Sequence, residues 1–435
     1  MSRTHLLPLL ALAWGCGSAQ KAESPGGSSG TGAGQAGQGG TVAAGGQTSG
    51  GTSATAGTLA SGGNEAGTAG SGAASGGRSG AAGSEASGNG GTGATGGTSP
   101  GGSGGNAGSD EAGGEGNEAG DSGETPTDPA PGAYGERPDL LAANSEMAVA
   151  ELDGKIYVLG GYPASRVIQD AVQIYDIASE EWSLGTPLPV PIHHPVAVGL
   201  AGKIYSLGGQ LTMGSGADTD RTLEYDPSTE LWSDLAPMPT PRGAGAAAVI
   251  GDRIYVVGGR PPAGNAFEVY DVSEDEWTEL PPLPTAINER NHLAAAAIGG
   301  KIYVAGGRYD GGSFSDPMTD AVDVFDPAEN AWSSASPLPR PRGGVNGIAA
   351  HGCFHVWGGE GSGIGEPNDV FPDHDVYDPR SDTWTSLPPL PTPIHGVTGA
   401  AFVDGIIYMP GGGTQSGGSS GSALFQVYRP DLKCE

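Results

Sequence analysis

The sequence has 435 residues, of which 82 are glycine, and a formal net charge of −30 at pH 7. Average proteins contain about 7% glycine, so this chain is strongly enriched in it. A chain this acidic repels the phosphates of nucleic acids and the headgroups of anionic lipids, which excludes general nucleic-acid binding.

The first residues predict export. Arg3 precedes a short apolar run that ends in small residues before Cys16. This pattern is typical of a signal peptide, and the run is too short for a membrane-spanning helix. Gly15 followed by Cys16 resembles the end of a bacterial lipoprotein signal, although Ala13 and Trp14 depart from that pattern. The resemblance implies a signal peptide over residues 1–16 and a lipid on Cys16, and ordinary cleavage with secretion is the alternative.

Residues 17–132 contain no Phe, Trp or Tyr and are dominated by Gly, Ser and Ala. Such a segment cannot bury enough apolar surface to offset the entropy lost on ordering. We predict a disordered low-complexity linker here. Residues 133–435 are sufficient for one sizeable domain.

A repeat organises this domain. It is marked by six glycine doublets that begin at Gly160, Gly208, Gly258, Gly306, Gly358 and Gly411, spaced 48, 50, 48, 52 and 53 residues apart. Each doublet follows a β-branched and aromatic run such as Lys301–Ala305, and most of these runs follow a two-residue Gly or Asp turn. These features predict two strands joined by a tight hairpin.

Each doublet is followed by a third predicted strand that ends in an aromatic residue. In the first five repeats a Trp comes seven residues after that aromatic, as in Tyr270 and Trp277, and opens a fourth strand. Four antiparallel strands repeated six times predict a propeller. The doublets and the aromatic-to-Trp spacing resemble the kelch-repeat β-propeller family, and the whole chain resembles a bacterial kelch-repeat lipoprotein. We interpret these aromatics as packing between blades.

The sixth repeat ends before its fourth strand, because the residue seven positions after Tyr428 is Glu435. Residues 134–140 match the pattern of a fourth strand. We therefore predict an all-β, six-bladed kelch propeller closed by an N-terminal strand, which leaves no open sheet edge.

The longer connections, between the second and third strands, predict a binding face. Segments 311–320 and 361–369 are the richest in polar and glycine residues. At the entrance of the inner strands we place Asn144, Ile192, Arg242, Arg290, Arg342 and His395, with His194 and His292 two residues further along. The candidate ligand-binding residues are Arg242, Arg290, Arg342, His395, His194 and His292, a basic ring that could pair with a carboxylate or sulfate. The alternative is that the arginines belong to the repeat pattern and bond loop carbonyls.

Cys353 and Cys434 are both expected near the face of short turns, and a disulfide between them is a possibility that the compartment would permit. His351, Cys353 and His355 alternate along one predicted strand, but His355 replaces a packing Tyr and His351 lies in a turn. We assign no metal site, no cofactor and no catalytic residues.

Three functions remain open at this point. The first is an exported, membrane-tethered binding module, monomeric, that uses its long-loop face to bind a glycan, peptide or envelope polymer, with an anionic glycan or a protein as partner. The second is a sugar-modifying enzyme resembling the six-bladed kelch sialic-acid mutarotases. The third is a structural or assembly component of a bacterial envelope. The expected location is extracytoplasmic, anchored to a bacterial membrane or secreted.

Overall fold

The computed structural model describes residues 127–434 apart from 215–216, 285–289, 310 and 312. The predicted signal peptide, Cys16 and nearly all of the predicted linker lie outside the described residues. Within the part of the chain that is described, no helix is both long and apolar enough to cross a membrane.

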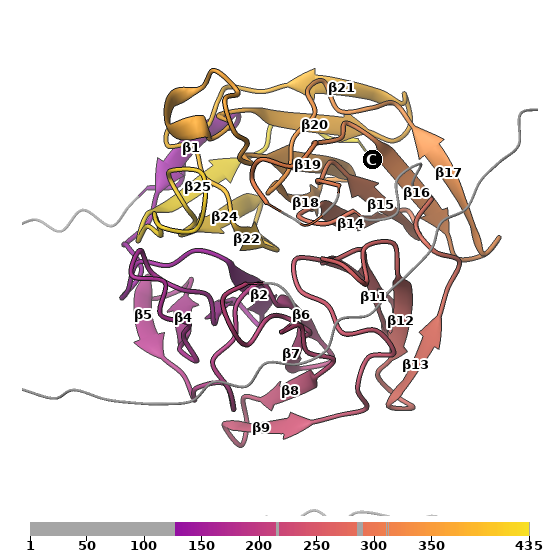
Figure 1. The fold of residues 1–435 in the computed structure, drawn as a ribbon. Helices are drawn as coiled ribbons and strands as arrows, with labels where there is room; N and C mark the ends of the chain where they lie inside the picture. The colour runs from indigo at the N-terminus through magenta and orange to yellow at the C-terminus, as the bar shows by residue number, and fades with distance from the viewer. Residues whose placement is uncertain (1–126, 215–216, 285–289, 310, 312, 435) are drawn as a thin grey trace, which may run out of the picture. The chain divides into compact units, whose positions relative to one another are not determined.

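Six antiparallel sheets are arranged as blades around a central axis (Figure 1). From the axis outward, the strands are β2 (Met147–Leu152), β3 (Lys155–Leu159), β4 (Val172–Asp176) and β5 (Glu181–Leu184) in blade one; β6 (Val196–Leu200), β7 (Lys203–Leu207), β8 (Thr222–Asp226) and β9 (Leu231–Asp234) in blade two; β10 (Ala246–Ile250), β11 (Arg253–Val257), β12 (Phe267–Asp271) and β13 (Glu276–Glu279) in blade three; β14 (Ala294–Ile298), β15 (Lys301–Ala305), β16 (Val322–Asp326) and β17 (Ala331–Ala335) in blade four; β18 (Asn346–Ala350), β19 (Cys353–Trp357), β20 (His374–Asp378) and β21 (Thr383–Ser386) in blade five; and β23 (Ala401–Val403), β24 (Ile406–Pro410), β25 (Phe425–Arg429) and β1 (Ala133–Glu136) in blade six. A short 3-10 helix, η1 (Pro367–Asp369), lies in a loop of blade five.

The ring is closed in two places. The N-terminal strand β1 pairs with β25 and sets Tyr134 opposite Tyr428, with the two ring centroids 4.8 Å apart. This confirms the predicted closure, although the strand ends at Glu136, before Pro138, which cannot donate to a ladder. Near the axis, β22 (Val397–Thr398) leaves the inner strand of blade six and pairs in parallel with β2 of blade one. The first and last blades are therefore joined at both their outer and inner edges.

The repeated Trp residues join neighbouring blades, as the sequence predicted for the aromatics. The indole N–H of Trp277 donates to the backbone carbonyl of Ala236 in the previous blade, at 2.9 Å, while its ring lies 5.0 Å from that of Tyr270. The other four Trp residues donate in the same way to the carbonyls of Pro138, Thr186, Pro281 and Ser336. Each Trp therefore fills space between blades and also satisfies a carbonyl in the connection that precedes it.

The glycine doublets are the points where blades meet near the axis. Both glycines of the first doublet have positive φ, at 62° for Gly160 and 81° for Gly161. A Cβ on Gly160 would lie 2.3 Å from the carbonyl oxygen of Ile192 in blade two, and the N–H of Gly161 donates to that same oxygen. Only glycine fits this conformation and this close approach, which explains why the doublet recurs.

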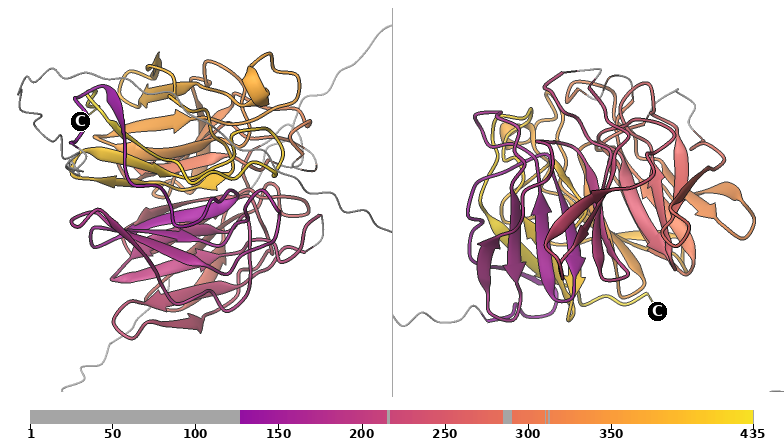
Figure 2. Two further views of the ribbon diagram at one scale, coloured as in Figure 1. Left: turned by 90° about the vertical axis from the view of Figure 1, so that its left-hand side faces the viewer. Right: turned by 90° about the horizontal axis from the view of Figure 1, so that it is seen from below.

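The two faces of the propeller differ in the length of their connections. Long loops follow the second strand of each blade on one face, and short hairpin turns lie on the other (Figure 2). The C-terminus lies on the face of short turns, where Cys434 and Cys353 form a disulfide with their Cα atoms 5.0 Å apart. The disulfide that the sequence left open is thus present in the structure, and it attaches the end of the chain to β19 of blade five.

Candidate functional site

The three arginines predicted to form the binding ring are instead buried inside their own blades. Arg242, Arg290 and Arg342 are each at most 1% exposed. They pair with carboxylates on the third strands, which are Glu268, Asp323 and Asp375 respectively. The prediction of an anion site at these arginines is wrong, because each guanidinium turns into the blade and its charge is already matched.

These arginines also bond the backbone around the glycine doublets. Arg290 donates from Nε to the carbonyl of Gly306 at 2.7 Å and from Nη2 to that of Ala321 at 2.7 Å. In blade one, Asn144 takes the equivalent place and donates to the carbonyl of Gly160 at 2.6 Å. The alternative interpretation, that these positions bond loop carbonyls, is the one that the structure bears out.

His395 does not occupy the position that the sequence gave it. The residue equivalent to Arg342 is Ile394, because the carbonyls of both accept a hydrogen bond from the second glycine of the preceding doublet. His395 therefore lies one residue further, in line with His193 and Asn291. The predicted ring is shifted by one residue in blade six.

A ring of six residues with left-handed backbone conformation closes the axis next to the inner strands. It consists of Glu146, His194, Ala244, His292, Gly344 and Gly396, whose φ angles lie between 53° and 72°. Successive members are linked from blade to blade: His194 donates its N–H to the carbonyl of Glu146, Ala244 to His194, His292 to Ala244, and Gly344 to His292, at 2.7 to 3.0 Å. Glu146 closes the ring by donating to Gly396. Two of the predicted site residues, His194 and His292, are members of this ring.

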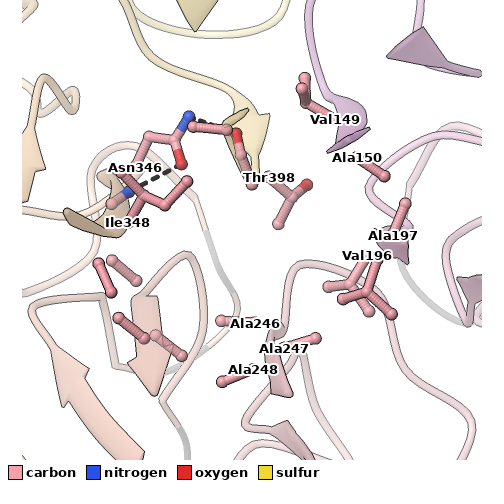
Figure 3. Close-up of a pocket in the computed structure, with 18 of the residues that line it drawn as sticks. Val149, Ala150, Val196, Ala197, Ala246, Ala247, Ala248, Asn346, Ile348 and Thr398 are labelled. Atoms are coloured by element: carbon pink, nitrogen blue, oxygen red, sulfur yellow. Dashed lines mark hydrogen bonds between the residues drawn. The ribbon is translucent and has the colours of Figure 1, made fainter. Parts of the chain in front are cut away.

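A central channel begins at this ring and runs between the inner strands (Figure 3). Its volume is about 350 Å³ and most of its lining is small and apolar. Figure 3 shows Val149, Ala150, Val196, Ala197, Ala246, Ala247, Ala248 and Ile348 along it, with Asn346 and Thr398 as polar groups. Both polar side chains bond the backbone: Asn346 donates to Gly399 at 2.7 Å and Thr398 to Pro195 at 2.9 Å. The channel therefore offers shape but few free polar groups.

The chemistry at the axis comes from residues directly after the glycine doublets, which sequence reasoning missed. They are Tyr162, Gln210, Arg260, Arg308, Glu360 and Gly413. Each is bridged or hydrogen-bonded through its backbone to the entrance of the inner strand of its own or the next blade, as in the pairing of Asn291 with Arg308. The sequence did hold a signal, because this position differs in every blade while the two glycines before it do not vary. A position that varies beside an invariant one is free of the demands of the scaffold.

One half of the polar cluster centres on Glu146 and His194. Glu146 Oε2 lies 2.8 Å from His194 Nε2, and both side chains are nearly fully buried. Burial opposes ionisation of Glu146, but the nearby His194, His395 and His292 hold its pKa well below the ordinary value. Burial lowers the pKa of His194, and burial together with the charge of His194 lowers that of His193 to about 3.

Arg260 lies beside this pair. Its Nη1 donates to Gln210 Oε1 at 2.9 Å, and its Nη2 lies 3.3 Å from His194 Nε2 and 3.4 Å from His292 Nε2. Its Nε is buried and has no hydrogen-bond partner. Burial lowers the pKa of Arg260, an effect that Glu146 partly offsets.

The other half of the cluster joins blades four, five and six. Arg308 Nη2 lies 2.8 Å from Glu360 Oε1, and Glu360 Oε2 accepts the N–H of Gly417. His395 lies 3.4 Å from Glu360 through Nδ1 and bonds the carbonyl of Gln415 through Nε2 at 2.7 Å. Burial raises the pKa of Glu360, but His395 and Arg308 together bring it below the ordinary value. The loop that carries Gln415 and Gly417 thus covers this half of the cluster.

The loops around the cluster carry exposed apolar and basic side chains. Val167 is 60% exposed, Leu211 39% and Phe314 38%. Arg166 lies 6.0 Å above the ring of Tyr162, which in turn contacts the ring of His193 at 5.2 Å. The long-loop face therefore combines a polar, partly cationic centre with an apolar rim.

Comparisons with known proteins agree with this architecture. The family model described as the KLHDC2/KLHL20/DRC7 Kelch-repeats domain matches residues 192–413, and the Kelch motif model matches residues 143–189. The chain is similar to Kelch-like protein terF of Aspergillus terreus, at 30% identity over 308 residues, which is 69% of this chain and 56% of that protein. It is also similar to Kelch-like protein 35 of Mus musculus, at 29% identity over 36% of this chain and 24% of the mouse protein. The chain thus spans about half or less of the length of these relatives.

Among solved structures, the structure of YjhT matches with a TM-score of 0.57 and 16% identity, over 68% of this chain and 98% of that chain. At this identity the likeness concerns the fold alone.

Proposed function

Because the chain belongs to the kelch-repeat family, whose propellers are a protein-binding fold, we propose that it is a binding module that holds a carboxylate of its ligand at Arg260 on the long-loop face. The observation that carries this proposal is the electrostatic state of Arg260. Each fully buried arginine among the described residues, namely Arg137, Arg242, Arg290, Arg308 and Arg342, has a carboxylate within ion-pair distance.

Arg260 differs from these arginines. It is half-buried, and the side chains within hydrogen-bond distance of it are those of Gln210, His194 and His292. An arginine desolvated in this way gains most from an incoming carboxylate, which accepts two parallel N–H bonds from the guanidinium. In a chain with a net charge of −30, such a cation stands out against its surroundings and favours an anionic group there.

The rim supports the same proposal. Val167, Leu211 and Phe314 surround the centre with exposed apolar surface, and Arg166 adds a second cation above Tyr162. Apolar and aromatic contacts supply area at binding sites, while a few polar groups fix the orientation of the ligand. A carboxylate-bearing peptide or glycan fits both parts.

Retention of the purified full chain on immobilised matrices tests the proposal. We expect retention on poly-L-glutamate or polygalacturonate, weakened by salt, and none on neutral dextran. Arg260→Gln should lose this retention while keeping its fold, because glutamine can still bond Gln210. Arg253→Gln is the matched control, since Arg253 is 57% exposed at the start of β11 in the same blade. Equal retention of the Arg260→Gln variant, or no retention of the wild type on either acidic matrix, would contradict the site.

The proposal includes export and membrane tethering through Cys16. Its support is the sequence pattern at residues 1–16, which ends in Gly15-Cys16. In a bacterial host, the wild type should appear in the membrane fraction with an acyl group on Cys16, measured by mass spectrometry. Cys16→Ser should be released from that fraction. An unmodified Cys16 on a membrane-bound chain would contradict lipidation.

A second candidate is sugar modification of the kind performed by sialic-acid mutarotases. It is favoured by the Glu146–His194 pair, because a carboxylate hydrogen-bonded to an imidazole can exchange protons at near-neutral pH. The test is anomeric exchange of N-acetylneuraminic acid, followed by NMR with and without the protein. An exchange rate that the wild type does not raise above that of His194→Gln removes this candidate.

A further inference from the structure

We propose that Glu146, Glu360 and His395 form a binding site for a divalent transition metal such as Zn²⁺. One oxygen of each carboxylate and one ring nitrogen of His395 all lie within 4.8 Å of one another. The three side chains come from blades one, five and six and are at most 5% exposed. The inference is independent of the proposed function, because it does not require Arg260 to bind a ligand.

The tautomer of His395 is the first argument. Its Nε2 lies 2.7 Å from the carbonyl oxygen of Gln415, and a carbonyl can only accept, so Nε2 carries the proton. In the neutral imidazole the Nδ1 lone pair then faces Glu360 Oε1 at 3.4 Å and Glu146 Oε1 at 3.8 Å. This Nδ1 is buried and has no hydrogen-bond partner. Three electron-rich atoms that face one another in a buried space require a cation between them.

The spacing of these atoms is the second argument. Bonds of roughly 2.0–2.2 Å to a tetrahedral zinc separate neighbouring ligand atoms by roughly 3.3–3.6 Å. The separations of 3.4 and 3.8 Å between Nδ1 and the two oxygens are close to this range and too long for strong hydrogen bonds. The bond from His395 to the Gln415 carbonyl is also the outer contact by which metal-binding histidines are commonly oriented.

The ligand types select the class of metal. One imidazole and two carboxylates suit Zn²⁺ and other first-row transition ions, whereas Ca²⁺ and Mg²⁺ prefer oxygen ligands alone. Three protein ligands leave a fourth position for water.

The neighbouring group of Glu146, His194 and His292 also has metal-ligand spacing, but a cation already occupies it. Arg260 Nη2 lies between the two histidines, at 3.3 and 3.4 Å from their Nε2 atoms. The two carboxylate oxygens of Glu146 therefore serve different partners. Oε2 bonds His194, while Oε1 faces His395.

Zinc uptake by the purified full chain tests the site. The protein is treated with a chelator, dialysed at pH 7.5 and titrated with Zn²⁺ alone, with calorimetry and elemental analysis as readouts. Co²⁺ provides a spectroscopic readout, since its visible absorption reports the coordination geometry. His395→Gln removes Nδ1, while the glutamine Nε2 can still donate to Gln415. His351→Gln is the matched control, because His351 lies in the turn before β19, on the face of short turns.

We expect the wild type and His351→Gln to bind one equivalent of Zn²⁺ more than His395→Gln, and to gain thermal stability from it. The His395→Gln affinity should fall by about 100-fold or more, because loss of an outer partner alone typically costs 10–100-fold. Should His395→Gln fail to fold, Glu146→Gln serves as the second variant. Equal zinc content in wild type and variant, or no uptake by the wild type, would overturn the proposal and leave His395 as a protonated imidazolium between the two carboxylates.

Discussion

The buried arginines make a strong prediction about stability, which Arg290→Ala tests. Arg290 is 1% exposed and forms an ion pair with Asp323. It also donates to the carbonyls of Gly306 and Ala321, both at 2.7 Å. Removing it leaves a buried carboxylate without its counter-charge, which typically costs about 3–5 kcal/mol. Each backbone carbonyl that no water can reach adds about 1 kcal/mol or more. We therefore expect the free energy of unfolding to fall by about 4 kcal/mol or more.

The assay is urea unfolding followed by tryptophan fluorescence. The control is Arg253→Ala, because Arg253 pairs with Asp271 at 3.2 Å but is 57% exposed. Exposed pairs contribute about 0–1 kcal/mol, so this variant should unfold almost like the wild type. A cost below about 1 kcal/mol for Arg290→Ala would refute the structural role and restore the interpretation that this arginine binds a ligand.

The same variant has a pH dependence with a definite sign. Burial already raises the pKa of Asp323, against the effect of Arg290. Without Arg290 this pKa rises further, so the folded variant takes up a proton at a pH where the unfolded chain does not. A carboxyl with a raised folded-state pKa loses stability as the pH increases from the unfolded pKa toward the folded one. The difference between wild type and variant should therefore be larger at pH 8 than at pH 5.

Three further predictions follow from the closure of the ring, from the repeated Trp and from the disulfide. Deleting residues 1–136 removes β1 and should lower the melting temperature well below that of a deletion of 1–126, whereas equal melting temperatures would contradict closure by β1. Trp277→Phe loses the bond to Ala236 and should cost about 1 kcal/mol in urea unfolding, with no cost as the opposing result. Cys434→Ser opens a link between residues 81 positions apart and should cost about 2–4 kcal/mol, and two reactive thiols in the denatured, unreduced wild type would show that the link is not formed.

The sequence was sufficient for the fold because the demands of a propeller recur. Gly160 and Gly161 must have positive φ, and a side chain on either would collide with a neighbouring blade, so the doublet is repeated wherever blades meet. Trp277 must both fill the space between blades and bond Ala236, which keeps its spacing from Tyr270 constant. The missing sixth Trp then pointed to Tyr134 as its replacement, in the strand that pairs with β25.

The arginine ring failed because repeat position fixes where a backbone lies but not where a long side chain turns. The sequence contained the information needed to orient it. In the repeats that have Arg242, Arg290 and Arg342, the residue two before the aromatic is acidic, namely Glu268, Asp323 and Asp375. In the repeats that begin with Asn144, Ile192 and Ile394, it is Gln173, Leu223 and Gln426. Such matched changes within one chain are typical of direct contact, and they indicate that each arginine pairs inside its own blade.

The same logic locates function in this molecule. A six-fold ring brings equivalent positions to one radius, so a repeated residue there can only build scaffold or a symmetric pore. An asymmetric site must come from positions at which the blades differ. Tyr162, Arg260 and Glu360 occupy one such position, and His395 belongs to another, beside His193 and Asn291. All of these side chains meet at the long-loop end of an axis that is otherwise lined by small apolar residues. Charge at that end is therefore a property of the differences between repeats, and variants at these positions should alter binding without altering the fold.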